Sequence, residues 1–173
     1  MTLTTSPTTS SIPRATASAT EVHDDIATLD SHEPLVSRSA LDSRARQLVP
    51  CAVQRQLWLI LLDDDQVQLP VMIPIGDLPL RCRSADGEGL QELLSGLDKE
   101  FGVGSFVFIM ERPGSAAVDE TDRRWLRYLL HSCDDEPTSV RGVYLCHDEG
   151  LIGYERSDLP ELEAHPGPGD SES

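Results

Sequence analysis

Apolar residues in this chain are concentrated in short runs between residues 57 and 154. The first run, 57–62 (LWLILL), has the length of a β-strand, and the polar residues 63–66 (DDDQ) separate it from a second run, 67–75 (VQLPVMIPI). This pattern predicts a β-hairpin. Because proline cannot donate to a strand ladder, Pro70 and Pro74 indicate that the second strand lies at a sheet edge or carries a bulge.

Two later segments have the spacing of amphipathic helices. The first ends before Gly102, its expected C′ residue, and its apolar stripe is formed by Leu90, Leu93, Leu94, Leu97 and Phe101. The second begins with Asp119 as the predicted N-cap, and Asp122 stands where it completes a capping box. Its predicted buried face consists of Trp125, Leu126, Leu129, Leu130 and Cys133.

Three further runs have strand character: 106–110 (FVFIM), 143–146 (VYLC) and 151–154 (LIGY), the last two joined by a turn at 147–150. The predicted order of elements is therefore ββ-α-β-α-ββ. Strands that alternate with helices in this way predict an α/β fold, with a mixed β-sheet flanked by helices.

Composition divides the chain into three parts. Eleven of the first twenty residues are Ser or Thr, so residues 1–45 are predicted to form a disordered tail, although a short helix is possible at 39–48 (SALDSRARQL). Residues 46–158 are predicted to form a single α/β domain. The segment 159–173 is acidic and rich in Pro and Gly, which predicts a second solvated tail.

The net charge and the apolar content exclude several classes of binding partner. The chain has 30 acidic and 14 basic residues, a net charge of −16, which disfavours direct contact with nucleic acid and with anionic membranes. No apolar run approaches the roughly 20 residues of a membrane span, and the N-terminus lacks the features of a secretory signal. We therefore expect a cytoplasmic protein with reduced thiols at Cys51, Cys82, Cys133 and Cys146.

Few residues have the spacing that metal or catalytic chemistry requires. His131, Cys133, Cys146 and His147 could in principle converge on zinc, but positions i and i+2 of a helix point to different faces. The run 63–65 (DDD) lacks the spacing of a calcium loop. No nucleophile elbow or phosphate-binding glycine motif is present in the sequence. We expect no metal, no cofactor and no catalytic residue.

The segment 106–130 carries the strongest candidate site, because a loop leaves a buried strand there and enters a capped helix. Its candidate residues are Glu111, Arg112, Pro113, Gly114, Asp119 and Asp122. Arg112 could hold an anion at this position. Alternatively, it pairs with the surrounding carboxylates, Asp122 first among them, and fixes the loop.

This order of elements resembles the RadC-like branch of the JAB/MPN (JAMM) domains, across residues 55–157. That family carries a His-x-His-Pro loop and then Ser-x-x-Asp at a helix start. Pro113, Gly114 and Asp122 match this pattern, whereas Met110 and Arg112 stand at the two histidine positions. Asp119 stands at the serine position, with a spacing one residue short. The resemblance implies a zinc hydrolase fold that has lost its metal ligands, and an accessory role in nucleic-acid metabolism without direct contact.

The segment from 111 to 130, followed by VRGVYLC, also resembles actinobacterial proteins. From all these observations we expect a non-catalytic α/β binding or regulatory module that acts through contacts with a protein partner. The alternative is an enzyme or a small-molecule site at the strand-to-helix loop, 111–122.

Overall fold

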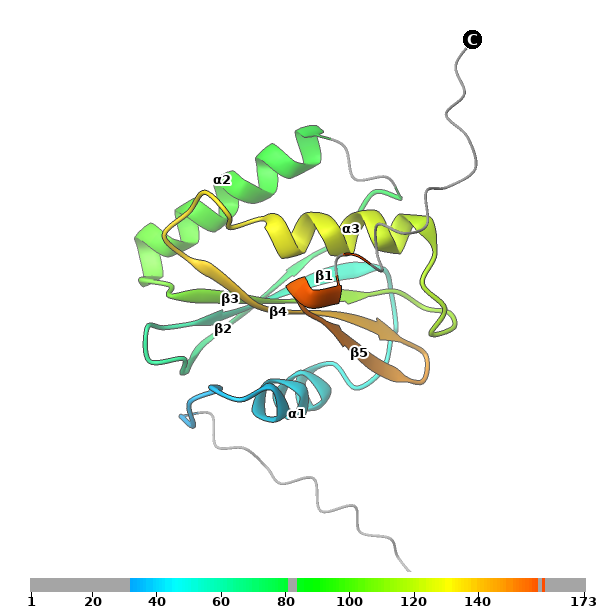
Figure 1. Cartoon of the computed structure of the whole chain (residues 1–173), viewed down its shortest axis with the longest axis horizontal. Coiled ribbons are helices and arrows are strands. Elements are labelled where there is room, and N and C mark those ends of the chain that lie inside the picture. The colour runs from blue at the N-terminus through cyan, green and yellow to red at the C-terminus, as the bar shows by residue number, and fades with distance from the viewer. Residues whose placement is uncertain (1–31, 81–83, 159, 161–173) are drawn as a thin grey trace, which may run out of the picture.

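Five strands form one mixed sheet in the order β2-β1-β3-β4-β5 (Figure 1). The computed structural model describes residues 32–80, 84–158 and 160, and of 84–86 it describes the backbone only. The strands are β1 (Gln56–Leu62), β2 (Gln68–Ile75), β3 (Ser105–Glu111), β4 (Ser139–His147) and β5 (Gly150–Tyr154). Only β3 and β4 are parallel neighbours among them, and the other neighbouring pairs are antiparallel. The predicted mixed sheet is confirmed.

Helices cover both faces of the sheet. The helices α2 (Ser84–Phe101) and α3 (Glu120–His131) lie on one face, and α1 (Arg38–Leu48) lies on the other (Figure 1). A short 3₁₀ helix, η1 (Arg156–Asp158), follows β5. The order ββ-α-β-α-ββ is thus confirmed, with α1 added in front of it. Within the described part of the chain, every helix falls short of the length and apolar character that crossing a bilayer needs.

The first hairpin follows the sequence closely. The strand that contains Pro70 and Pro74 is the edge strand β2, and its pairing with β1 is irregular between Ile60 and Leu62, as the prolines predict. Asp63 forms the turn, since its carboxylate accepts the N–H groups of Asp65 at 3.0 Å and Val67 at 2.9 Å. The acidic run 63–65 therefore shapes a turn.

The core beneath α2 and α3 is the larger of two. It joins alternate residues of the central strands to the two helices, and its largest members include Phe106, Phe108, Met110, Trp125 and Leu126. All five residues of the predicted α3 face are buried. The predicted α2 stripe is only partly buried, because Leu93 and Phe101 are 36% and 41% exposed. These two residues lie at the margin of the helix face rather than at its centre.

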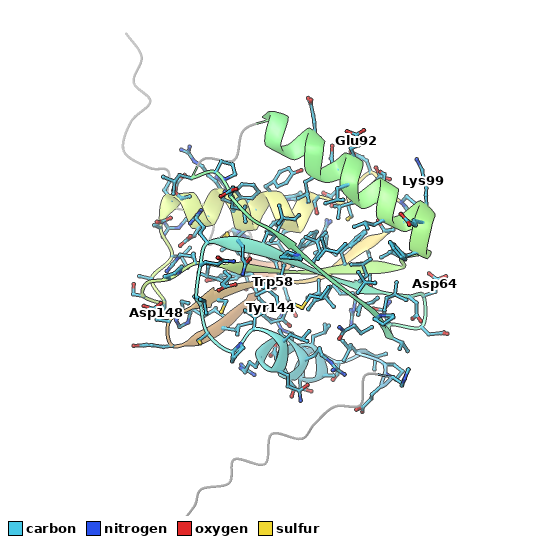
Figure 2. All side chains as sticks on the ribbon, turned by 180° about the vertical axis from the view of Figure 1, so that it is seen from behind. Trp58, Asp64, Glu92, Lys99, Tyr144 and Asp148 are labelled. Carbon is cyan, nitrogen blue, oxygen red and sulfur yellow. The ribbon has the colours of Figure 1, made fainter. Side chains whose placement is uncertain are left out.

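A second core lies between the sheet and α1. Ile60, Leu62, Val107, Ile109 and Cys146 of the sheet pack there against Leu35, Leu41, Ala45 and Val49. Figure 2 shows Trp58 and Tyr144 in the same layer, between the sheet and α1. The strands β1 and β3 are thus apolar on both faces, and α1 is needed to shield the second face from water.

Polar contacts also hold α1 in place. Tyr144 donates its hydroxyl to Asp42 at 2.8 Å, and the guanidinium of Arg38 lies over the Tyr144 ring, 5.7 Å from its centre. Just before the helix, the Val36 carbonyl accepts from Arg141 at 2.8 Å. These contacts fasten α1 to β4.

The predicted domain boundary at residue 45 is therefore wrong. The helix considered for 39–48 exists as α1, is capped by Ser37 and belongs to the domain, and even Leu35 is only 1% exposed. Apolar residues are sparse before residue 50, but among the described ones Leu35, Leu41, Ala45 and Val49 are buried against the sheet, and Ala40 and Leu48 are partly buried there. Residues 1–31 and 161–173, predicted as tails, lie outside the described residues.

We predict that Leu41→Ala destabilises the protein by about 2–5 kcal/mol, because it leaves a cavity between α1 and the sheet. Denaturant unfolding of the full chain measures the change. Val36→Ala, at a position 65% exposed, is the matched control and should change the free energy of unfolding by less than about 0.5 kcal/mol. Equal effects of the two substitutions would show that α1 is not part of the cooperative unit.

Candidate functional site

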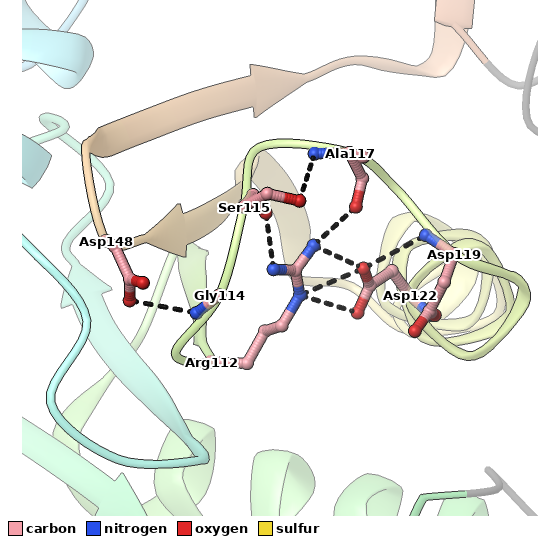
Figure 3. A network of polar contacts seen from close by, with 7 residues as sticks. All are labelled: Arg112, Gly114, Ser115, Ala117, Asp119, Asp122 and Asp148. Atoms are coloured by element: carbon pink, nitrogen blue, oxygen red, sulfur yellow. Dashed lines mark hydrogen bonds and ion pairs between the residues drawn. The ribbon is translucent and has the colours of Figure 1, made fainter.

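Arg112 is the centre of a polar network at the carboxyl end of β3 (Figure 3). Its Nε and Nη2 atoms donate to the carboxylate of Asp122, with the shortest contact at 2.7 Å from Nη2 to Oδ2. Nη1 donates to the Ser115 carbonyl at 2.6 Å, and Nη2 donates to the Ala117 carbonyl at 2.7 Å. Nε, Nη1 and both protons of Nη2 are thereby engaged, which accounts for four of the five guanidinium N–H groups.

Asp122 joins this network to the start of α3. It accepts the backbone N–H of Asp119 at 3.2 Å, and Asp119 accepts the N–H of Asp122 at 2.8 Å, so the predicted capping box is present. The side chains of Arg112 and Asp122 are 11% and 0% exposed. The hydrogen bonds that Arg112 donates to Asp122 raise the pKa of Arg112, although burial opposes this. The predicted ion pair between Arg112 and Asp122 is confirmed.

The loop is also fixed to the neighbouring turn between β4 and β5. The Gly114 N–H donates to the Asp148 carboxylate at 2.8 Å (Figure 3). The Asp148 N–H donates in turn to the Gly114 carbonyl at 3.1 Å. Gly114 has φ +123°, a conformation that favours glycine. Pro113 precedes it and is exposed. The loop residues 113–119 are therefore held by α3 on one side and by the β4–β5 turn on the other.

Glu111 lies apart from this network, although it precedes Arg112 directly. Successive residues of a strand point to opposite faces, so Glu111 faces the α1 side of the sheet. Its Oε1 accepts the backbone N–H groups of Val53 at 2.5 Å and Gln54 at 3.0 Å. Its Oε2 accepts from the side chains of Gln56 at 2.6 Å and Trp58 at 2.7 Å.

The sequence placed Glu111 among the candidate residues of the loop, but Glu111 does not join Asp119 and Asp122 around Arg112. Instead, the Glu111 carboxylate is 2% exposed and enclosed by four donors, none of which carries a charge. Burial opposes its ionisation, but the hydrogen bonds outweigh burial and lower the pKa of Glu111 below its ordinary value of 4.5. Glu111 holds the connector from α1 to β1 against β3.

The geometry favours the structural interpretation of the loop. The buried guanidinium of Arg112 and the buried carboxylate of Asp122 have partners within the chain, so the network fixes the backbone of the loop and offers little to an incoming anion. The sequence did not predict that the carbonyls of Ser115 and Ala117 accept from Arg112. It also did not predict the contact of the loop with Asp148 or the donors that surround Glu111. Backbone acceptors have no side-chain signature, and the donors to Glu111 come from residues more than fifty positions away.

The four possible zinc ligands do not converge. Cys133 belongs to the core beneath α2 and α3, whereas Cys146 belongs to the core beneath α1, on the opposite face of the sheet. Burial raises the pKa of both thiols, that of Cys146 to about 12, so neither readily forms the thiolate that binds zinc. His131 contacts Asp134, and His147 accepts the N–H of Glu149.

No group of three or more potential metal ligands comes together within the described residues. Cys82 lies outside them. In comparisons with known proteins, no protein-family model matches the chain and no curated protein is significantly similar to it. The resemblance to the RadC-like branch therefore stays a prediction.

We predict that Arg112 and Asp122 are energetically coupled. Arg112→Met and Asp122→Asn should each cost about 3 kcal/mol or more, because each leaves a buried partner without its counter-charge. The double variant should cost clearly less than the sum of the two. The exposed pair Arg124 and Glu120, 2.9 Å apart on the same helix, is the control cycle, with an expected coupling below about 1 kcal/mol. Denaturant unfolding of all variants gives both couplings, and a value near zero for the buried pair contradicts the structural role.

A second prediction concerns pH. Because folding lowers the pKa of Glu111, its contribution to stability is complete above 4.5 and is lost as the pH falls through the lower, folded value. Glu111→Gln removes this contribution and presents an amide N–H₂ to the donors. The variant should therefore be less stable at pH 7, and the difference from wild type should shrink below pH 4.5. Unfolding curves between pH 3 and pH 7 are the measurement, with the exposed Glu88→Gln as control. A difference that stays constant across this range would contradict the prediction.

Proposed function

We propose that this chain is a non-catalytic binding or regulatory module that acts through contacts with a protein partner. The observation that carries the proposal is the closed network of Arg112, whose donors are engaged by Asp122 and by two loop carbonyls. A loop that holds its own polar groups in this way is a rigid scaffold. An enzyme or an anion site at 111–122 would need a buried polar group that is free to react or to bind. The buried groups there, Arg112 and Asp122, are engaged with each other and with the loop.

We further propose that the chain is a relative of the RadC-like JAB/MPN domains in which an ion pair stands in for the metal. Met110, at the first histidine position, is fully buried in the core beneath α2 and α3. Arg112, at the second, places a positive charge against Asp122, the residue that the pattern would assign to zinc. A permanent cation at this position satisfies the aspartate without offering a Lewis acid for hydrolysis.

The test combines partner capture with metal analysis of the full chain. Affinity purification of the tagged protein from its host, read by mass spectrometry, should give one reproducible partner. The purified partner and the purified chain should then form a complex with a Kd of about 10 μM or tighter. Protein prepared with added zinc should retain far less than one zinc per chain after gel filtration, because Arg112 cannot bind a cation.

Two results would contradict the proposal. One is the failure of every enriched protein to bind the purified chain, relative to a tag-only control. The other is a zinc content of about one per chain that is lost in Asp122→Asn, since this would place a metal where we place an ion pair.

A further inference from the structure

An apolar groove lies where the end of β2, the connector 76–80, α2 and α3 meet. Its volume is about 230 Å³. The side chains that line it are Leu57, Ile75, Leu78, Leu90, Leu93 and Trp125. The groove is therefore built from the sheet, both helices of this face and the connector, and none of the candidate residues at 111–122 contributes to it.

Among the described residues that line it, the groove wall offers no free polar side-chain group. Apart from the six side chains above, it is completed by Gly76, Pro79 and Gly89. Trp125 Nε1 is the one polar side-chain atom in this set, and it donates to the Pro79 carbonyl at 3.0 Å. A charged ligand group would lose its hydration in the groove and gain no side-chain partner, so the groove selects against charge.

Two glycines keep the groove open. A Cβ atom added to Gly76 or to Gly89 would have no heavy atom within 4 Å. Glycine is among the least favourable residues within a helix, and Gly89 lies within α2 with no neighbour that forbids a side chain there. The space that a larger residue would occupy at position 89 is left to the groove.

The surroundings of the groove fit a small molecule better than a protein surface. Five large apolar side chains are exposed among the described residues, and Leu93 is the one of these that lines the groove. Leu80, next in the chain to Pro79, is 68% exposed, whereas Val36 precedes α1 and Phe101 ends α2. A stable protein interface buries about 800 Å² on each partner, and the exposed apolar side chains beside this groove, Leu80 and Leu93, are too few to form the apolar centre of one here.

We propose that the groove binds an uncharged, largely apolar small molecule with one or two rings. Its volume exceeds the roughly 150 Å³ of an apolar cavity that accepts benzene. Trp125 supplies an aromatic wall against which a ring can pack. This site is additional to the protein contacts proposed above and does not depend on them.

Indole is the probe, and the full chain supplies its own reporters. The sequence has two tryptophans, Trp125 in the groove and Trp58 on the α1 face of the sheet, so ¹H–¹⁵N spectra contain one indole N–H signal from each location. Added indole should shift the Trp125 signal in a saturable manner and leave the Trp58 signal in place. Free tryptophan, which has the same ring and two charged groups, should bind at least about tenfold more weakly.

Gly89→Leu fills the groove and should weaken indole binding at least about tenfold, since the new side chain occupies the ring's volume. Gly96→Leu is the matched control, because position 96 lies on the same helix, has equally open space for a side chain and does not line the groove. It should change the affinity by less than about twofold. An unchanged Trp58 signal verifies that each variant is folded, and Gly89→Met is the substitute should Gly89→Leu fail this criterion.

Three outcomes would overturn the proposal: no saturable shift of Trp125, indole affinity unaffected by filling position 89, or free tryptophan binding as tightly as indole.

Discussion

The central strands β1 and β3 are apolar on both faces, and the rest of the fold follows from the need to cover them. In these two strands every residue is buried except Trp58, which is partly buried. Since α2 and α3 both pack on the same face of the sheet, a third element has to cover the other face. That element is α1, and its few apolar residues suffice because Trp58 and Tyr144 fill much of the same layer.

Two adjacent charged residues at the end of β3 then fix the connecting segments that the hydrophobic layers do not hold. Glu111 and Arg112 point to opposite faces, and each holds the connector on its own side of the sheet. Their charges are stabilised differently: Arg112 has a counter-charge in Asp122, whereas Glu111 is surrounded by neutral donors. Both arrangements keep a buried charge hydrogen-bonded, which is the condition for burying it at all.

Local sequence patterns were sufficient to predict most of the fold. The hairpin with its edge prolines, the capping box of Asp119 and Asp122, and the ion pair of Arg112 each depend on residues a few positions apart, and all are present. The errors concern long-range relations. The boundary predicted at residue 45 was wrong because runs such as LWLILL and FVFIM have to be covered on both faces, which requires a helix before residue 50. The orientation of Glu111 follows from strand alternation, but its donors come from a distant connector.

The same lack of local signal explains why the groove was not predicted. Its wall residues come from four separate parts of the chain, and each of them fits an ordinary core position when the sequence is read alone. Gly89 is the exception, since a glycine within the apolar periodicity of a helix is a recognisable irregularity. Its meaning depends on the space around it, which only the packing of α2 against the sheet determines.

The ion pair at the start of α3 and the groove are connected through that helix. Trp125 follows Asp122 by three positions and therefore lies on the same side of α3, one turn further on. Because Arg112 holds Asp122 in place, it also holds the turn that carries the Trp125 ring. The next contact along the helix fixes the opposite wall, since the Tyr128 hydroxyl donates to the Gly87 carbonyl at 2.7 Å.

A Cβ atom at position 87 would lie 3.0–3.2 Å from the Tyr128 side chain, so a residue larger than glycine there requires that side chain to shift. The distance between the groove walls is thus set by polar contacts that lie outside the groove. A site shaped in this way exists before any ligand arrives, and binding then costs little reorganisation of the chain. The charged loop at 111–122 and the apolar groove accordingly have separate roles on one helix, the first as support and the second as the open surface.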